Sequence, residues 1–310
     1  MSGRSKKLPV LLIMGATATG KTDLAVQLAE RFPVEIVSVD SALIYRDMDI
    51  GTAKPDAHIL RRAPHHLIDI LDPAESWSVW EFVQAATQLI HQIHAREHVP
   101  LLVGGTMMYF NALQQGMNDL PQTEPKIREE LNLRLREQGL ESLYAELQRV
   151  DVEMARRLDQ ADTQRILRAL EVFRISGQPM SLLQQKSIAK PDFDFRQVIL
   201  EVPERVELHQ RIEQRFQQMI EQGFEQEVES LRARGDLSLD LPSMRCVGYR
   251  QMWMYLDGNY RHSQMVERSV IATRQLAKRQ ITWLRKYQQA LRVDYKDVAL
   301  SDVSQYLGLE

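Results

Sequence analysis

The chain has 310 residues, of which 44% are hydrophobic, and a formal net charge of −3 at pH 7. This length gives room for one large domain or two smaller ones, and the charge excludes a general attraction to nucleic acid, so that only a local basic patch would provide one. The only cysteine, Cys246, excludes a disulfide framework and a cysteine metal cluster and fits a reducing cytoplasm. No stretch is long and apolar enough to predict a membrane span.

A phosphate-binding motif stands near the start of the chain. It consists of Gly15, Ala16, Thr17, Ala18, Thr19, Gly20, Lys21 and Thr22, which match the pattern G-x-x-x-x-G-K-[ST]. Residues 10–14 before it form an apolar run of strand type, and residues 23–31 after it have a helical pattern. We therefore predict a loop whose backbone amides and Lys21 bind a di- or triphosphate at a helix N-terminus, with the Thr22 hydroxyl placed to bind Mg²⁺.

Two further strand-like runs end in polar residues. Residues 34–39 end at Asp40, and residues 99–103 end in Gly104-Gly105-Thr106, with a helical pattern at residues 77–97 between them. Apolar strands separated by helices predict a parallel sheet, in which ligands gather at the carboxyl ends of the strands. Asp40 fits three roles there: a Mg²⁺ ligand, a general base or a helix N-cap. Because the second run ends without a carboxylate, Asp40 is the best-placed carboxylate for catalysis.

The character of the sequence changes from about residue 120. Charged helical patterns follow at residues 126–138, 140–150 and 164–175, with no strand pattern between them. Residues 195–202 then indicate a strand that returns to the sheet, and helical patterns follow at residues 206–234, 249–256 and 263–287. The predicted fold class is α/β: a phosphate-loop-type parallel sheet flanked by helices, formed by residues 1–119 and 191–310, with a helical insertion domain at residues 120–190.

The last of these helices is strongly basic. Residues 268–292 contain seven Lys or Arg and no Asp or Glu. One face of the helix carries Arg274, Lys278 and Arg285, and the other half is apolar. Such a helix is either a solvated surface element or a binding surface for a phosphate backbone. The single sign of its charges in a slightly acidic chain favours the second.

The residues alone leave several interpretations open. The loop and Asp40 fit a small-molecule kinase, with residues 120–190 as a lid, whereas the basic helix also fits an RNA-binding protein gated by a nucleotide. In the helix at residues 206–234, Arg211 and Arg215 lie one turn apart and indicate a solvated face on which Glu207 pairs with Arg211.

Several motifs taken together resemble the tRNA dimethylallyltransferase (isopentenyltransferase, IPP transferase) family of bacterial type. They are G-A-T-A-T-G-K-T, V-D-S-A-L-I-Y-R-D-M-D-I-G-T-A-K-P from Val39, L-L-V-G-G-T-M-M-Y from Leu101, D-T-Q-R-I-L-R-A-L-E-V from Asp162, R-I-E-Q-R-F-Q-Q-M from Arg211, R-C-V-G-Y-R-Q-M-W from Arg245 and A-K-R-Q-I-T-W-L-R from Ala277. They occur in the family's order and cover nearly the whole chain. Ala16 stands where the family usually has Pro, and the zinc finger of some eukaryotic members is absent.

The resemblance implies that the chain transfers a dimethylallyl group from dimethylallyl diphosphate to N6 of the adenosine just 3′ of the anticodon, in tRNAs that read codons starting with U. It implies that the phosphate loop holds the diphosphate and its Mg²⁺ in place of ATP. Asp40 would be the general base, and Thr106 and Arg215 would bind the diphosphate.

The resemblance also implies contacts with the tRNA anticodon stem-loop. The implied residues are Asp40, Ser41, Ala42, Leu43, Thr106, Arg128, Gln164, Arg165, Ile166, Leu167, Arg168, Arg245, Cys246, Val247, Gly248, Tyr249, Arg250, Lys278, Arg279, Gln280, Ile281, Thr282, Trp283, Leu284 and Arg285. The insertion domain would take part in these contacts. We expect a cytoplasmic monomer with Mg²⁺ as its cofactor and no membrane partner.

Overall fold

A computed structural model describes residues 7–118, 120–185 and 191–309 of the chain. The chain divides into two compact units, one formed by residues 1–114 and 191–310 and the other by residues 115–190. In the described residues, no helix combines the length and the apolar character needed to cross a membrane.

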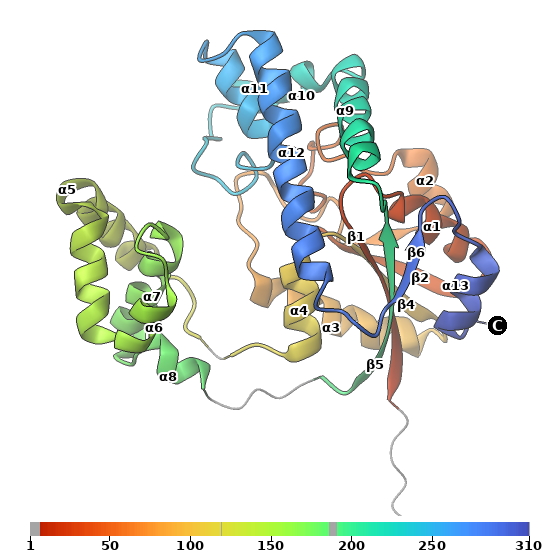
Figure 1. The fold of residues 1–310 in the computed structure, drawn as a ribbon, viewed down its shortest axis with the longest axis horizontal. Helices are drawn as coiled ribbons and strands as arrows, with labels where there is room; N and C mark the ends of the chain where they lie inside the picture. The colour runs from red at the N-terminus through yellow and green to blue at the C-terminus, as the bar shows by residue number, and fades with distance from the viewer. Residues whose placement is uncertain (1–6, 119, 186–190, 310) are drawn as a thin grey trace, which may run out of the picture. The chain divides into compact units, whose positions relative to one another are not determined.

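A six-stranded sheet forms the centre of the first unit (Figure 1). Its strands are β1 (Leu8–Gly15), β2 (Val34–Val39), β3 (His65–His66), β4 (Val99–Gly104), β5 (Phe193–Glu201) and β6 (Leu291–Asp294). They lie in the order β3-β2-β4-β1-β5-β6, and every pair of neighbours is parallel. The predicted α/β class with a parallel sheet flanked by helices is confirmed.

Both faces of the sheet are buried under helices. In β1, Val10 and Leu12 point to the face covered by α3 (Val79–Ala95) and α4 (Met107–Gln115). Leu11 and Ile13 point to the opposite face, covered by α1 (Lys21–Ala29) and α13 (Leu300–Leu307). Alternate residues of one strand thus enter two different cores, which is why the strands read as continuous apolar runs.

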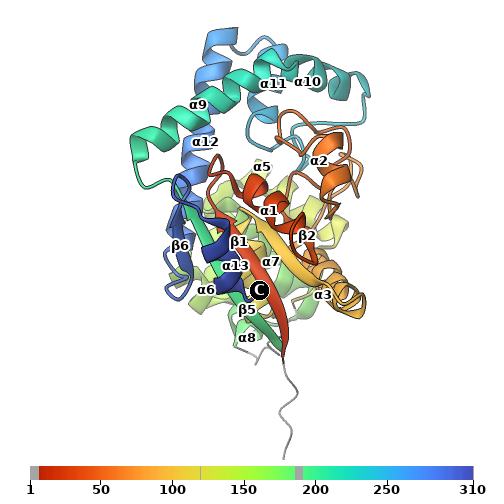
Figure 2. The same ribbon diagram turned by 90° about the vertical axis from the view of Figure 1, so that its right-hand side faces the viewer.

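A group of four helices lies beyond the carboxyl ends of the strands (Figure 2). It consists of α9 (Arg205–Glu221), α10 (Phe224–Ala233), α11 (Tyr249–Leu256) and α12 (His262–Leu284). The single helix expected at residues 206–234 is two helices, because Gly223 adopts a φ of 99° and ends the first. The apolar faces of these helices pack on one another and on residues of the phosphate loop, so this group forms a wall over the strand ends.

In the described residues of the second unit, all the regular elements are helices. It consists of α5 (Pro125–Val150), α6 (Val152–Arg157), α7 (Thr163–Ser176) and α8 (Met180–Gln184), and the α5 backbone is non-helical at Gly139. Leu131, Leu147 and Leu170 are fully buried in its core. It therefore has a hydrophobic core of its own.

Some short elements of the structure could not be predicted from the sequence patterns. The two-residue strand β3 and the four-residue strand β6 were not predicted, nor was the short helix α2 (Ala57–Arg62). Such elements have too few residues to display a period.

Candidate active site

The carboxyl ends of three neighbouring strands meet at one place. Gly104, at the end of β4, is paired with Met14 of β1 and with Val39 of β2. A Cβ atom on Gly104 would lie 2.0 Å from the Val39 carbonyl oxygen, so only glycine fits between the strands. The Thr106 amide donates to that same carbonyl at 3.2 Å. The Gly-Gly-Thr turn is thus fixed beside the end of β2.

The phosphate loop connects β1 to α1. Gly20 has a φ of 93° at the helix N-cap, a conformation that favours glycine. Two side chains brace the loop from inside, because the Thr19 hydroxyl and the Lys21 ammonium both donate to the Ala16 carbonyl, at 2.9 and 2.7 Å. From α9, Arg211 Nε donates to the Ala18 carbonyl at 2.8 Å. The loop is therefore braced both by its own side chains and by α9.

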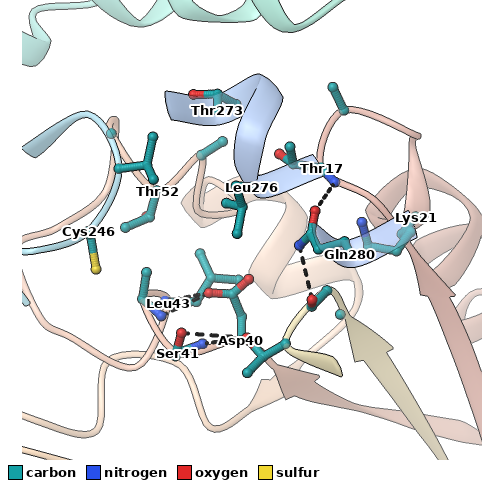
Figure 3. Close-up of a pocket in the computed structure, with 18 of the residues that line it drawn as sticks. Thr17, Lys21, Asp40, Ser41, Leu43, Thr52, Cys246, Thr273, Leu276 and Gln280 are labelled. Carbon is teal, nitrogen blue, oxygen red and sulfur yellow. Dashed lines mark hydrogen bonds between the residues drawn. The ribbon is translucent and has the colours of Figure 1, made fainter. Parts of the chain in front are cut away.

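A cavity of about 630 Å³ opens at these strand ends. Thr17 and Lys21 lie on one side of it and Thr52 and Cys246 on the other, with Asp40 between them (Figure 3). The predicted site residues that line it are Thr17, Ala18, Lys21, Thr22, Asp40, Ser41, Ala42, Leu43, Thr106, Arg215, Arg245, Cys246, Val247, Tyr249, Arg279, Gln280 and Trp283. Segments far apart in the sequence thus contribute to one cavity.

Other predicted residues lie elsewhere in the first unit. Ala16, Thr19, Lys278, Ile281, Thr282, Leu284 and Arg285 line a second cavity of about 740 Å³. Gly15, Gly20, Gly248 and Arg250 do not line the first cavity. Helix α12 thus divides its residues between two cavities.

Two cations lie close together in the first cavity. Burial and, to a smaller extent, the Arg215 charge lower the pKa of Lys21 to about 7, while the Asp40 carboxylate acts in the opposite direction. Burial also lowers the pKa of Arg215, again opposed by Asp40. Among the described residues, none forms a hydrogen bond or ion pair with the Arg215 guanidinium. A bound anion would add to the countercharge that Asp40 alone supplies to these two groups in the cavity.

The two oxygens of Asp40 are used differently. Oδ1 accepts from the amides of Ala42 at 2.8 Å and Leu43 at 3.4 Å; no helix begins here, so these bonds hold a turn and the helix N-cap role is wrong. No described residue donates to Oδ2, and the carboxylate points into the cavity (Figure 3). The Thr106 hydroxyl accepts from the Ser41 amide at 3.2 Å and so fixes the residue next to Asp40. One oxygen of this side chain therefore holds the turn, and the other is left for chemistry in the cavity.

The structure corrects the pairing expected for Arg211. Glu207 accepts instead from the Tyr295 hydroxyl and from Lys296 Nζ, the latter at 2.9 Å. The Arg211 guanidinium lies over the Tyr295 ring, 4.2 Å from its centroid, and bonds the phosphate loop. The i,i+4 pair is replaced because a strand-end loop distant in the sequence packs against the first turn of α9.

A loop clamp that sequence reasoning missed shapes another wall of the cavity. One carboxylate, that of Glu227 on α10, accepts from the amides of Asp49, Ile50 and Gly51 at 2.9, 2.7 and 3.1 Å. It also accepts from the Tyr249 hydroxyl. A Cβ atom on Gly51 would lie 2.1 Å from the Phe224 ring, so a glycine is required there. No local pattern marks Glu227, although the G-T-A-K-P run marks the loop that it holds.

The helical unit contains the remaining predicted residues. Ile166 and Leu167 are buried in its core, so their side chains pack against neighbouring helices. Arg128 Nη2 donates to the side-chain Oε1 of Gln164 at 2.9 Å, and Arg168 bonds the buried carboxylate of Glu171 at 2.9 Å. Arg165 is largely exposed. The arginines of α7 thus differ in exposure, because Arg165 is largely exposed beside Asp162 whereas Arg168 bonds a buried carboxylate.

The sequence model of the family described as IPP transferase matches residues 43–287. The chain belongs to the IPP transferase family. It is 54% identical over 292 residues to the tRNA dimethylallyltransferase of Cupriavidus necator, covering 92% of this chain and 91% of that protein. It is 52% identical over 297 residues to that of Burkholderia ambifaria, covering 94% and 92%.

Solved IPP transferase structures are also similar to this chain. The tRNA isopentenylpyrophosphate transferase of Bacillus halodurans matches with a TM-score of 0.71 and 35% identity, covering 97% of both chains. A eukaryotic dimethylallyltransferase described as acting on tRNA matches with a TM-score of 0.80 and 26% identity, covering 96% of this chain and 76% of that one. The sequence resemblance to the IPP transferase family is confirmed.

Proposed function

We propose that the chain catalyses the tRNA dimethylallyltransferase reaction. It transfers the dimethylallyl group of dimethylallyl diphosphate to N6 of the adenosine on the 3′ side of the anticodon, in tRNAs that read codons starting with U, and releases diphosphate. One observation carries this proposal: a single cavity joins a phosphate loop and two close cations, Lys21 and Arg215, to the carboxylate of Asp40.

The phosphate-loop side of the cavity stabilises the leaving group. When the bond between the allylic carbon and the diphosphate oxygen breaks, the oxygens gain negative charge and the carbon gains cationic character. Lys21, Arg215 and the loop amides are preorganised donors for those oxygens, which is the arrangement that lowers such a barrier most. Thr106, which lines the same cavity, is a further diphosphate ligand in this proposal.

The donor set fits Mg²⁺ bound together with the diphosphate. In the described residues no group of three His, Cys, Asp or Glu side chains could hold a metal ion by itself. Mg²⁺ is commonly bound through few protein oxygens together with substrate phosphates. Thr22 lines the cavity, and its hydroxyl has no hydrogen bond to a described residue. Thr22 would hold the ion, which would neutralise charge on the departing diphosphate.

Asp40 is the general base of the proposed reaction. The lone pair of an adenine N6 is delocalised into the ring, so the amine becomes a nucleophile only if its proton is removed as the new bond forms. As the carbon–nitrogen bond forms, the N6 proton passes to the Asp40 carboxylate. Because backbone amides hold Oδ1, the free oxygen keeps a fixed direction into the cavity.

An adenine stacked in an anticodon loop has to be flipped out to reach such a cavity. We propose that the exposed cations hold the RNA while this happens. In the first unit these are Arg245, Arg250, Lys278, Arg279 and Arg285, and in the helical unit Arg165 is exposed. Arg128, Gln164 and Arg168 are further proposed contacts of the helical unit. We expect the enzyme to act as a monomer in the cytoplasm, where its tRNA substrate is found.

The direct test is an incubation of the protein with labelled dimethylallyl diphosphate, Mg²⁺ and unmodified tRNA. The expected result is label on the tRNA, located after digestion on the nucleoside 3′ of the anticodon. Absence of label, with turnover of ATP instead, would overturn the proposal in favour of a kinase.

A further inference from the structure

Gln280 lies between the two loops that define the cavity. It projects from α12 and is buried, with 9% of its surface exposed. Its Oε1 accepts from the Thr17 amide of the phosphate loop at 2.9 Å, and its Nε2 donates to the Gly105 carbonyl at 3.0 Å (Figure 3). Both polar atoms of the carboxamide are therefore used, each by the backbone of a different loop.

These two loops serve opposite sides of the proposed reaction. Thr17 belongs to the loop that would receive the diphosphate. Gly105 leads directly into Thr106, whose hydroxyl accepts from the Ser41 amide next to Asp40. One carboxamide is thus inserted between the leaving-group side and the general-base side.

We infer that Gln280 is a positioning residue that sets the spacing between the phosphate loop and the Gly105–Thr106 turn. The inference rests on the function proposed above and assigns to Gln280 a role other than contact with RNA. Gln280 acts through Thr17 and Gly105. Displacing reacting groups by about 1 Å can cost on the order of 10²-fold in rate, so a fixed spacing matters for the transfer step.

The two hydrogen bonds by which Gln280 bridges Thr17 and Gly105 require a carboxamide at this position. A glutamate at this position would keep the acceptor for Thr17 but would set a carboxylate against the Gly105 carbonyl, and a methionine would provide neither bond. Leaving a buried amide or carbonyl without a partner is costly, so the loops would move to find other partners.

The same contact explains the second glycine of the Gly-Gly-Thr turn. A Cβ atom on Gly105 would lie 2.4 Å from Gln280 Nε2. Its other near neighbour, the Gly15 carbonyl oxygen, would be 3.3 Å away, a distance that a small shift relieves. The Gly105→Ala substitution would therefore displace the Gln280 carboxamide by a change in the turn that it contacts.

The first test compares Gln280→Met with Gln275→Met, an exposed residue of the same helix. Two quantities are measured: the affinity for inorganic pyrophosphate with Mg²⁺, by calorimetry, and the single-turnover rate of transfer with saturating substrates. For Gln280→Met we expect about tenfold weaker pyrophosphate binding and a rate lower by about 10- to 100-fold, with tRNA affinity within twofold of wild type. The control should match wild type.

Two outcomes would overturn the inference. One is wild-type pyrophosphate binding and rate in Gln280→Met. The other is a loss of rate that only follows the loss of folded protein in a thermal melt at the assay temperature. Because pyrophosphate binding needs no transfer, it tests the bridge even if the wild-type chain transfers nothing to tRNA, in which case the proposed function alone fails.

A double-mutant cycle separates the contact from general damage. Gly105→Ala alone should lower the rate about as much as Gln280→Ala alone. In a Gln280→Ala background the alanine at 105 no longer meets the carboxamide, so it should lower the rate by less than twofold further. Effects that multiply instead would show that the two residues act independently, and the inference would fail.

Discussion

The two sides of the cavity are built in different ways. The phosphate-loop side comes from one continuous segment, through Thr17, Ala18, Lys21 and Thr22, together with the cation Arg215. The side around Asp40 is assembled from separate segments: backbone amides hold the carboxylate, Thr106 holds the next residue, and Glu227 holds the wall formed by residues 49–51. The phosphate-loop side therefore supplies positive charge to the cavity, and the other side holds the Asp40 carboxylate in position.

Because the two sides differ in this way, substitutions on each side should have different effects on the transfer step and on the stability of the fold. Removing a group that meets the reacting atoms should affect the transfer step strongly and leave stability nearly unchanged. Removing a clamp should affect stability first and the reaction only through a loosened wall.

The largest effect is expected from Asp40→Asn. Asparagine can still accept from the amides of Ala42 and Leu43 but cannot take a proton from N6. The single-turnover rate of transfer should fall by about 10²- to 10⁴-fold, while the Kd for tRNA, measured by filter binding, changes less than about threefold. A collapse of tRNA affinity would make Asp40 a binding residue and leave the proposed reaction without its general base.

Arg215→Ala should come next, with a loss of about 10²- to 10³-fold in the transfer rate, because a preorganised donor to the departing oxygens disappears. Arg205, the exposed first residue of the same helix, provides the control substitution to alanine. Equal losses in the two variants would contradict a specific role for Arg215.

A pH dependence tests the charge of Lys21. Its pKa is lowered to about 7 by burial and by Arg215, and a bound diphosphate should raise it again. Below pH 7 the ammonium is already charged and binding needs no proton. Above pH 7 binding takes up a proton, so pyrophosphate affinity should fall with rising pH, by an amount approaching about tenfold per pH unit.

Calorimetry of pyrophosphate binding in two buffers of different ionisation enthalpy measures this proton uptake directly. In Lys21→Arg the guanidinium stays charged, and the part of the uptake due to residue 21 should disappear. Identical proton uptake in wild type and variant would contradict the lowered pKa.

Glu227→Gln tests the clamp. The amide nitrogen of glutamine cannot accept from the loop, so at least one backbone amide loses its partner, at a cost of about 1–3 kcal/mol in the free energy of unfolding. We expect a lower Tm and only a several-fold lower kcat/KM. Glu229→Gln, on the exposed side of α10, is the matched control. A loss of rate as large as that of Asp40→Asn would place Glu227 among the reacting groups instead.

The smallest effect is expected from Lys278→Ala. An exposed cation that meets one phosphate contributes modestly, so tRNA binding should weaken a few-fold and its salt dependence should decrease by about one unit of slope. Lys7→Ala, which removes an exposed charge paired with Asp192, should leave the slope unchanged. An unchanged slope in Lys278→Ala would make this part of α12 a solvated surface.

The contrast between a local motif and an assembled wall also explains which parts of the site could be predicted from the sequence. The phosphate loop is local, and its motif placed Lys21 and Thr22 beside the cavity together with the strand-end Asp40. The bridge and the clamp are long-range: Thr17 and Gln280 are 263 residues apart, and Asp49 and Glu227 are 178 apart. No periodic pattern connects such positions, so Glu227 was missed and Gln280 was assigned to RNA contact. The role of Arg215 in diphosphate binding stays a prediction.

In the proposed reaction, one cavity couples departure of diphosphate to alkylation of a single adenine. The most direct measurement quantifies both products in one reaction: pyrophosphate released, and N6-dimethylallyladenosine recovered from the digested tRNA. We predict equal amounts, formed only when tRNA is present and only at the adenosine 3′ of the anticodon. Release of pyrophosphate without modified adenosine, or modification at other nucleotides, would contradict this coupling.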